Sequence, residues 1–133
     1  MTPSTLVITR SRGRTLAGDL EEARGRAVEE MLAAGFIMGG RATFDILARL
    51  IAGKIKGDWR QAFYKNPKKF YKALVEAVGG ETMAYMILRM ATKRLRDLGI
   101  QVEGTEMIDA LKKGDKAKLL RIVDELAVAL ELV

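Results

Sequence analysis

Residues 66–99 read NPKKFYKALVEAVGGETMAYMILRMATKRLRDLG, and this stretch decides the fold. Asn66 is a residue typical of a helix N-cap, and Pro67 suits the first helical position. The residues that repeat at helical spacing after it are Phe70, Leu74 and Val78. Gly79-Gly80 then ends the helix. Thr82 is a second candidate cap, for an amphipathic helix that ends at Gly99. The stretch therefore predicts two consecutive helices joined by a glycine turn.

Similar signals predict helices on both sides of this pair. The predicted elements are a helix capped by Asp19 and running to about Ala34, a helix over about 42–54, a short turn or helix from Asp58, a helix from Thr105 to about Lys113, and a last helix capped by Asp115. We therefore predict a single all-α domain over residues 1–133. It is expected to be a compact bundle of about six short helices.

The N-terminus is predicted differently. In residues 4–9, apolar and polar residues alternate and several are β-branched, which favours one short strand. The alternative is that residues 1–15 form a flexible arm. A ribbon-helix-helix fold is disfavoured because the spacer from Arg10 to Gly18 is too long.

A lone strand needs a mate, so we predict a homodimer, supported by the apolar link Phe36-Ile37-Met38. Leu126 and Leu130 of the last helix are a second candidate contact. The alternative is that this helix closes the core of its own chain.

The chain has no histidine and no cysteine. These absences exclude imidazole bases, thiolate nucleophiles, Cys/His zinc sites and disulfides. The chain has two glycine-rich turns, at residues 35–40 and at Gly79-Gly80, and neither continues into the sequence of a phosphate-binding loop. The adjacent carboxylates Glu21-Glu22 and Glu29-Glu30 are explained by the helix dipole and by solvent exposure. We therefore predict no enzymatic activity and no cofactor.

Positive charge is concentrated in the middle of the chain, whose net charge is +6. Residues 58–99 hold nine Lys/Arg and four Asp/Glu, a net of +5, whereas residues 100–133 hold five and seven, a net of −2. Such a field favours nucleic acid or another polyanion, although a solvated face is the alternative. No apolar run is long enough to enter a membrane and no signal-peptide core is present, so we expect a cytoplasmic protein.

Two groups of residues are candidates for nucleic-acid binding. On the helix after Thr82, one arc of about 100° holds Arg89, Lys93 and Arg96 together with Tyr85 and Thr92. Arg94 falls on the apolar side instead, where its stem is expected to extend toward solvent and pair with Asp97, or to meet a partner subunit.

The second group is Lys68, Lys69 and Lys72, which are interleaved with aromatic residues. Basic and aromatic residues in this pattern can bind single strands by stacking, and only Tyr64 and Tyr71 are free to do so.

Residues 44–100 resemble a small archaeal helical module of the Nitrosopumilus output domain type. The resemblance lies in FDILARLIAGKIKGDWRQAFYKNPKKFYKALVEAVGG followed by ETMAYMILRMATKRLRDLGI. It implies an archaeal origin and a regulatory role, and it brings no catalytic residues. Few Gln and Asn, no Cys and abundant charge give the chain a thermophile-like composition.

These observations predict a non-enzymatic regulatory or interaction domain with nucleic acid as its partner. The alternatives are a protein–protein adaptor with no nucleic-acid role and, third, an enzyme that binds a small molecule.

Overall fold

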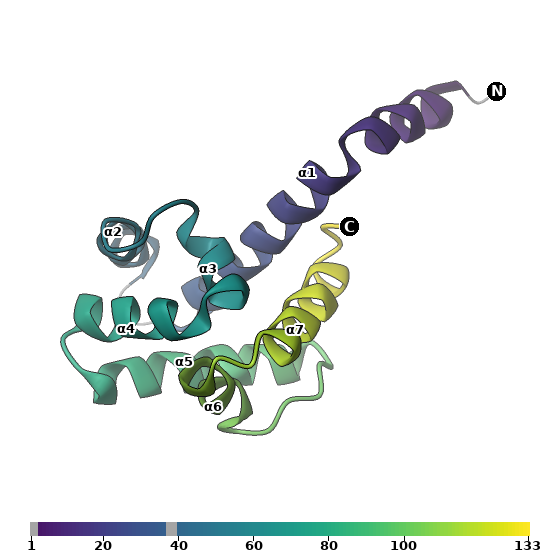
Figure 1. Cartoon of the computed structure of the whole chain (residues 1–133). Helices are drawn as coiled ribbons and strands as arrows, with labels where there is room; N and C mark the ends of the chain where they lie inside the picture. The colour runs from purple at the N-terminus through teal and green to yellow at the C-terminus, as the bar shows by residue number, and fades with distance from the viewer. Residues whose placement is uncertain (1–2, 37–39) are drawn as a thin grey trace.

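The computed structural model describes residues 3–36 and 40–133, with side chains from residue 18 onward, and this part of the chain is all-α (Figure 1). Its seven helices are α1 (Pro3–Ala34), α2 (Gly40–Ala52), α3 (Trp59–Lys65), α4 (Pro67–Val78), α5 (Glu81–Asp97), α6 (Glu106–Lys113) and α7 (Lys116–Ala129). The predicted fold class is therefore confirmed, with one more helix than the six expected.

The predicted N-terminal strand is wrong, because residues 4–9 lie within α1. A helix satisfies its own backbone hydrogen bonds, whereas a lone strand needs a second edge. Asp19 consequently lies inside a helix and is not its cap. The homodimer prediction loses the strand on which it rested and stays untested. Ile37 and Met38 of the apolar link lie outside the described residues.

The helical hairpin predicted from residues 66–99 is confirmed as α4 and α5 (Figure 1). Gly79 adopts a left-handed conformation with φ 92°, and its N–H donates to the carbonyl of Val75 at 3.0 Å. This geometry ends α4 where a residue with a Cβ would be strained. Gly80 precedes α5 and occupies its N-cap position, so the prediction that Thr82 caps this helix is wrong.

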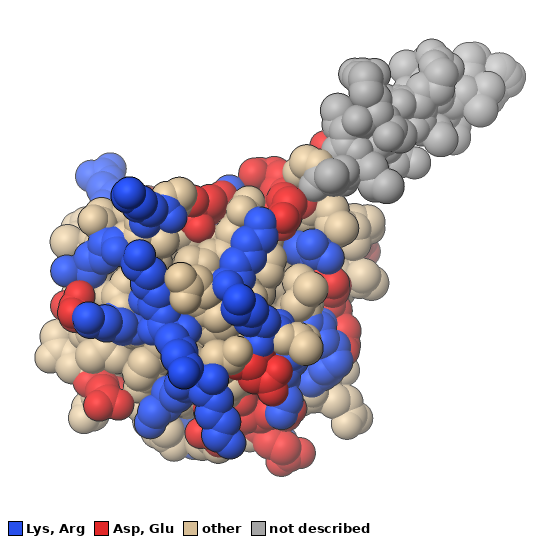
Figure 2. All heavy atoms as spheres, viewed as in Figure 1, with Lys and Arg blue, Asp and Glu red and all other residues tan. Residues whose placement is uncertain are grey.

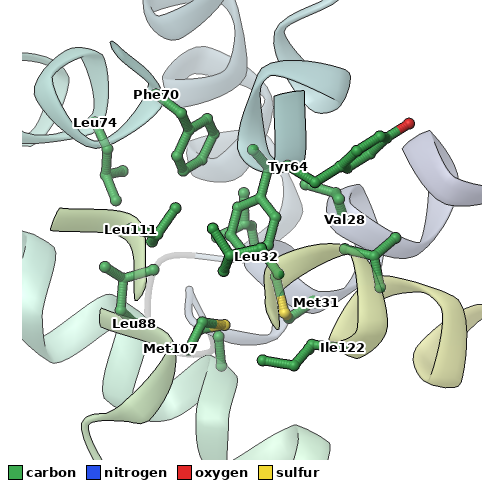
Figure 3. Close-up of a cluster of buried hydrophobic side chains, with 14 of the residues drawn as sticks. Val28, Met31, Leu32, Tyr64, Phe70, Leu74, Leu88, Met107, Leu111 and Ile122 are labelled. Carbon is green, nitrogen blue, oxygen red and sulfur yellow. The ribbon is translucent and has the colours of Figure 1, made fainter. Parts of the chain in front are cut away.

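One hydrophobic core draws side chains from all seven helices. Ten of its residues are labelled in Figure 3: Val28, Met31, Leu32, Tyr64, Phe70, Leu74, Leu88, Met107, Leu111 and Ile122. Leu126 is also buried there, so α7 closes the core of its own chain, as the alternative to a dimer contact expected. Leu50 and Met83 are exposed, although helical spacing groups each with the apolar residues of its own helix.

The C-terminal end of α1 approaches α5 very closely at Gly35. A Cβ placed on Gly35 would lie 2.7 Å from the carbonyl oxygen of Ile87, closer than any real side chain allows. Glycine at this position therefore sets the distance between the long first helix and the hairpin. No helix in the described part of the chain combines the length and the hydrophobicity that crossing a bilayer requires.

Candidate nucleic-acid interface

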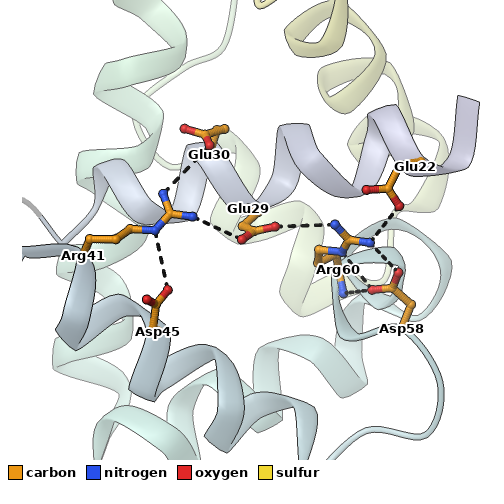
Figure 4. A network of polar contacts seen from close by, with 7 residues as sticks. All are labelled: Glu22, Glu29, Glu30, Arg41, Asp45, Asp58 and Arg60. Atoms are coloured by element: carbon orange, nitrogen blue, oxygen red, sulfur yellow. Dashed lines mark hydrogen bonds and ion pairs between the residues drawn. The ribbon is translucent and has the colours of Figure 1, made fainter. Parts of the chain in front are cut away.

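The carboxylates of α1 are engaged by two arginines, as Figure 4 shows. Arg60, at the start of α3, contacts Asp58 at 2.9 Å, Glu22 at 3.2 Å and Glu29 at 3.4 Å. Arg41 of α2 binds the other side of Glu29 at 3.2 Å. Hydrogen bonds from Arg60 lower the pKa of Asp58, which also accepts the backbone N–H of Arg60 and so caps α3.

A second polar cluster joins α1 to α3 at Glu21. Lys65 binds one carboxylate oxygen of Glu21 at 2.8 Å, and the hydroxyl of Tyr64 donates to the other at 2.6 Å. These two contacts lower the pKa of Glu21, whereas burial and the bond to Glu21 raise the pKa of Tyr64. The sequence suggests the helix dipole and solvent exposure as the explanation of these carboxylates. That explanation is wrong for Glu21, Glu22 and Glu29, because all three bind cations.

These clusters separate the positively charged side chains into two groups. Among the twenty Lys and Arg whose side chains are described, nine lie in ion pairs and eleven do not. Five of the six predicted nucleic-acid-binding residues belong to the second group: Lys68, Lys69, Lys72, Arg89 and Arg96. The sixth, Lys93, pairs with Asp97 at 3.4 Å. The predicted residues are therefore mostly those that the fold leaves without an anionic partner.

The three lysines of α4, Lys68, Lys69 and Lys72, are exposed and line a single groove with a volume of about 510 Å³. We call these three residues the lysine surface. Lys54 and Glu76, which pair at 3.6 Å, form another part of the groove wall. Figure 2 shows Lys and Arg side chains spread across the face on which α3 and α4 lie in Figure 1.

The position of the lysine surface is unfavourable for α4 itself. Lys68 and Lys69 directly follow Pro67, in the first turn of the helix, and this turn holds no acidic residue. Cations at a helix N-terminus oppose the helix dipole, which favours anions there. Helix stability therefore does not explain why lysines stand in this turn. The backbone N–H groups at the start of α4 and the lysine side chains both favour binding of an anion there.

Lys68 also connects the lysine surface to the turn between α6 and α7. A Cβ placed on Gly114 would lie 3.2 Å from Cε of Lys68, so the lysine stem lies over that turn. Lys113 and Lys116 flank the turn, are exposed and lie in no ion pair within the described part of the chain. The positive surface therefore extends from α4 toward these two residues.

On α5, Arg89, Lys93 and Arg96 lie on one exposed side of the helix and line a hollow of about 630 Å³. Arg89 lies over the ring of Tyr85 and donates to its hydroxyl at 2.7 Å. Thr92 was placed in the same arc, but it is only 2% exposed and its hydroxyl donates to the carbonyl of Leu88. The helix packs against α1, α4 and α6, and its buried side extends as far as Thr92.

The structure does not bring the two predicted groups into one site. The groove of the lysine surface and the hollow beside Arg89 have no residue in common. Their chemistry also differs, because the α5 side carries exposed methionines and a tyrosine beside its cations. The sequence alone did not identify Met86 and Met90 as exposed residues of this side. They follow Met83 at i+3 and i+7, and this helical spacing could have indicated a common stripe.

The aromatic residues near the lysine surface are not free to stack on bases. Tyr64 is 4% exposed and belongs to the core. Tyr71 is half-buried, and its hydroxyl donates to Glu81 at 3.0 Å. The prediction that Tyr64 is an exposed stacking residue is therefore wrong, and the lysine surface offers charge without exposed rings.

Arg94 is exposed and does not pair with Asp97, whose carboxylate binds Lys93 instead. Its side chain borders a hollow of about 340 Å³ whose walls include Leu98, Leu126 and Leu130. The prediction that its stem extends over apolar residues to solvent agrees with this position, whereas the predicted pairing with Asp97 is wrong.

Comparisons with protein-family models, with curated proteins and with solved structures give no match. The resemblance of residues 44–100 to the Nitrosopumilus output domain type stays a prediction. In the described residues, no group of three or more Asp and Glu is placed to hold a metal ion.

Proposed function

We propose that this protein is a non-enzymatic, DNA-binding regulatory domain whose lysine surface contacts the phosphate backbone. The observation that carries the proposal is that Lys68, Lys69 and Lys72 line one groove, are exposed and pair with no carboxylate among the described residues. Phosphate contacts from lysines supply most of the affinity of non-specific binding and make it depend on salt.

The chemistry of this groove favours duplex over single strands. Single-strand binding without sequence preference combines positive charge with exposed aromatic rings, and the rings nearest the lysine surface are engaged in the fold. Binding is therefore expected to be independent of base sequence and at least as tight for a duplex as for a single strand of equal length.

The test is fluorescence anisotropy with labelled duplex and single-stranded DNA over a series of salt concentrations. Replacing all three lysines with alanine should reduce the slope of log affinity against log salt by about 3, since each phosphate contact contributes about 0.9. A matched control replaces Arg26, Arg49 and Lys56, which are exposed, form no ion pair with the side chains that the structure describes and stand outside the groove.

Several outcomes would overturn the proposal. Affinity weaker than about millimolar at low salt, or a missing salt slope, excludes nucleic acid as the partner. An equal loss in the control variant shows that net charge, and no defined surface, attracts DNA. If replacing Arg89, Lys93 and Arg96 with Glu abolishes binding while the α4 variant retains it, the interface lies on α5.

A further inference from the structure

The exposed side of α5 carries three methionines at helical spacing. Met83, Met86 and Met90 are 47%, 55% and 39% exposed, and we call them the methionine face. At 100° per residue they fall within about 60° of one another, so they form a single stripe along the helix. Isolated exposed apolar residues are ordinary, but a contiguous stripe is typical of an interaction surface.

Unpaired arginines border the methionine face on both sides. Arg94 lies on one edge of the stripe, and Arg89 and Arg96 lie beyond the other edge. All three are exposed and lie in no ion pair within the described residues. Nearest the stripe, Lys93 is already neutralised by Asp97. The methionines form an apolar ridge between positive margins, and Asp97, seven residues after Met90, continues the line of the ridge as a carboxylate paired with Lys93. This surface differs from the purely charged lysine surface.

We propose that the methionine face binds an amphipathic helix of a partner protein whose apolar stripe is flanked by carboxylates. Methionine side chains are flexible and polarisable, so they adapt to apolar partners of different shapes. A helix presents apolar residues at i, i+3 and i+7, the same spacing as Met83, Met86 and Met90. The arginine margins select acidic flanks and disfavour basic ones.

This surface is separate from the lysine surface, so the two proposals can fail independently. The probe is a labelled synthetic helix of roughly 20 residues, with leucines at i, i+3 and i+7 and glutamates on both flanks. One control peptide has the same composition in scrambled order. A second carries lysine in place of each glutamate. Binding is measured by fluorescence anisotropy, and the mass of the protein by light scattering.

The amphipathic acidic peptide should bind at least about tenfold more tightly than either control peptide. Replacing Met83, Met86 and Met90 with serine should weaken its binding about tenfold or more. Replacing Arg89 and Arg94 with glutamine should weaken it less and reduce the effect of salt. Substituting Ile46 and Leu50, which are exposed on α2, with serine is the matched apolar control and should change nothing.

Equal binding of the scrambled peptide, or full affinity in the methionine variant, overturns the proposal. Loss of peptide binding in the lysine-surface variant also overturns it, because the peptide would then be held by charge on α4. A dimer that dissociates when the methionines are replaced would show that the occupant is a second copy of this chain. Circular dichroism melting of each variant confirms that the exposed substitutions leave the fold intact.

Discussion

The guanidinium of Arg60 lies directly against Gly25 of α1. A Cβ at Gly25 would be 2.9 Å from Cζ of Arg60, so a larger residue at this position would require the arginine side chain to shift. From that position Arg60 reaches Glu22 and Glu29, one turn on either side of Gly25, as well as its own cap residue Asp58. The contact fixes α3 on α1 and therefore positions the start of α4 and its lysine surface.

Replacing Arg60 with methionine should destabilise the protein by about 1–3 kcal/mol, because three carboxylates lose their shared partner. Replacing Arg41 with methionine should cost less than about 1 kcal/mol, since its side chain is 54% exposed and solvent screens its ion pairs. Urea denaturation of both variants measures the difference. Equal losses would show that Arg60 contributes no more than a surface ion pair.

Substitution by alanine should change the stability in opposite directions at two glycines, Gly18 within α1 and Gly35 directly after it. Gly35→Ala should cost about 1–3 kcal/mol, because its Cβ would press on the backbone of Ile87, which cannot rotate away. Gly18→Ala should stabilise the protein by about 0.5–1 kcal/mol, since no described atom of another part of the fold lies within 4 Å of a Cβ placed there and alanine favours the helix. Thermal unfolding compares the two, and a stable Gly35→Ala protein would contradict this close approach.

The boundaries of α4, α6 and α7 could be predicted because their signals are local. Pro67 marks the start of α4, Gly79 its end and Gly114 the end of α6, and each of these residues stands next to the boundary that it marks. Residues 4–9 could not be assigned in the same way. Their β-branched side chains favour a strand only where a second edge is available, and the described part of the chain has no strand.

The candidate surfaces were predicted only in part, because exposure depends on packing between distant segments. Helical angles placed Arg89 and Arg96 correctly on the exposed side of α5 and misplaced Thr92, which is buried. The partners of Arg60 are equally remote, since Glu22 is 38 residues away in the sequence. Which cations stay unpaired could therefore be learned only from the assembled fold.

The two predicted caps of the C-terminal helices should differ in their effect on stability. The carboxylate of Asp115 accepts the backbone N–H of Lys118 at 3.1 Å, so Asp115→Ala should cost about 1 kcal/mol. Thr105 stands at the cap position of α6 without such a bond, and Thr105→Ala should change stability by less than about 0.5 kcal/mol. Urea denaturation tests both, and a larger loss for Thr105 would contradict the observed geometry.

The cluster of Glu21, Tyr64 and Lys65 should make the stability depend on pH at both extremes. The pKa of Glu21 lies below its ordinary value of 4.5, chiefly because Lys65 and Tyr64 bind the carboxylate. The unfolded chain therefore binds a proton before the folded protein does as the pH falls. Stability contributed by this group is fully present above pH 4.5 and is lost as the pH falls through the lowered pKa.

Tyr64 has the opposite sign. Burial and the bond to Glu21 raise its pKa above the ordinary 10.0, so its contribution is complete below that pH and is lost as the pH rises beyond it. Urea denaturation at about pH 3, pH 7 and pH 11 should show the highest stability at neutral pH. Glu21→Gln should flatten the acid side and Tyr64→Phe the alkaline side. An unchanged alkaline slope in Tyr64→Phe would show that another group, and not this buried hydroxyl, governs the loss.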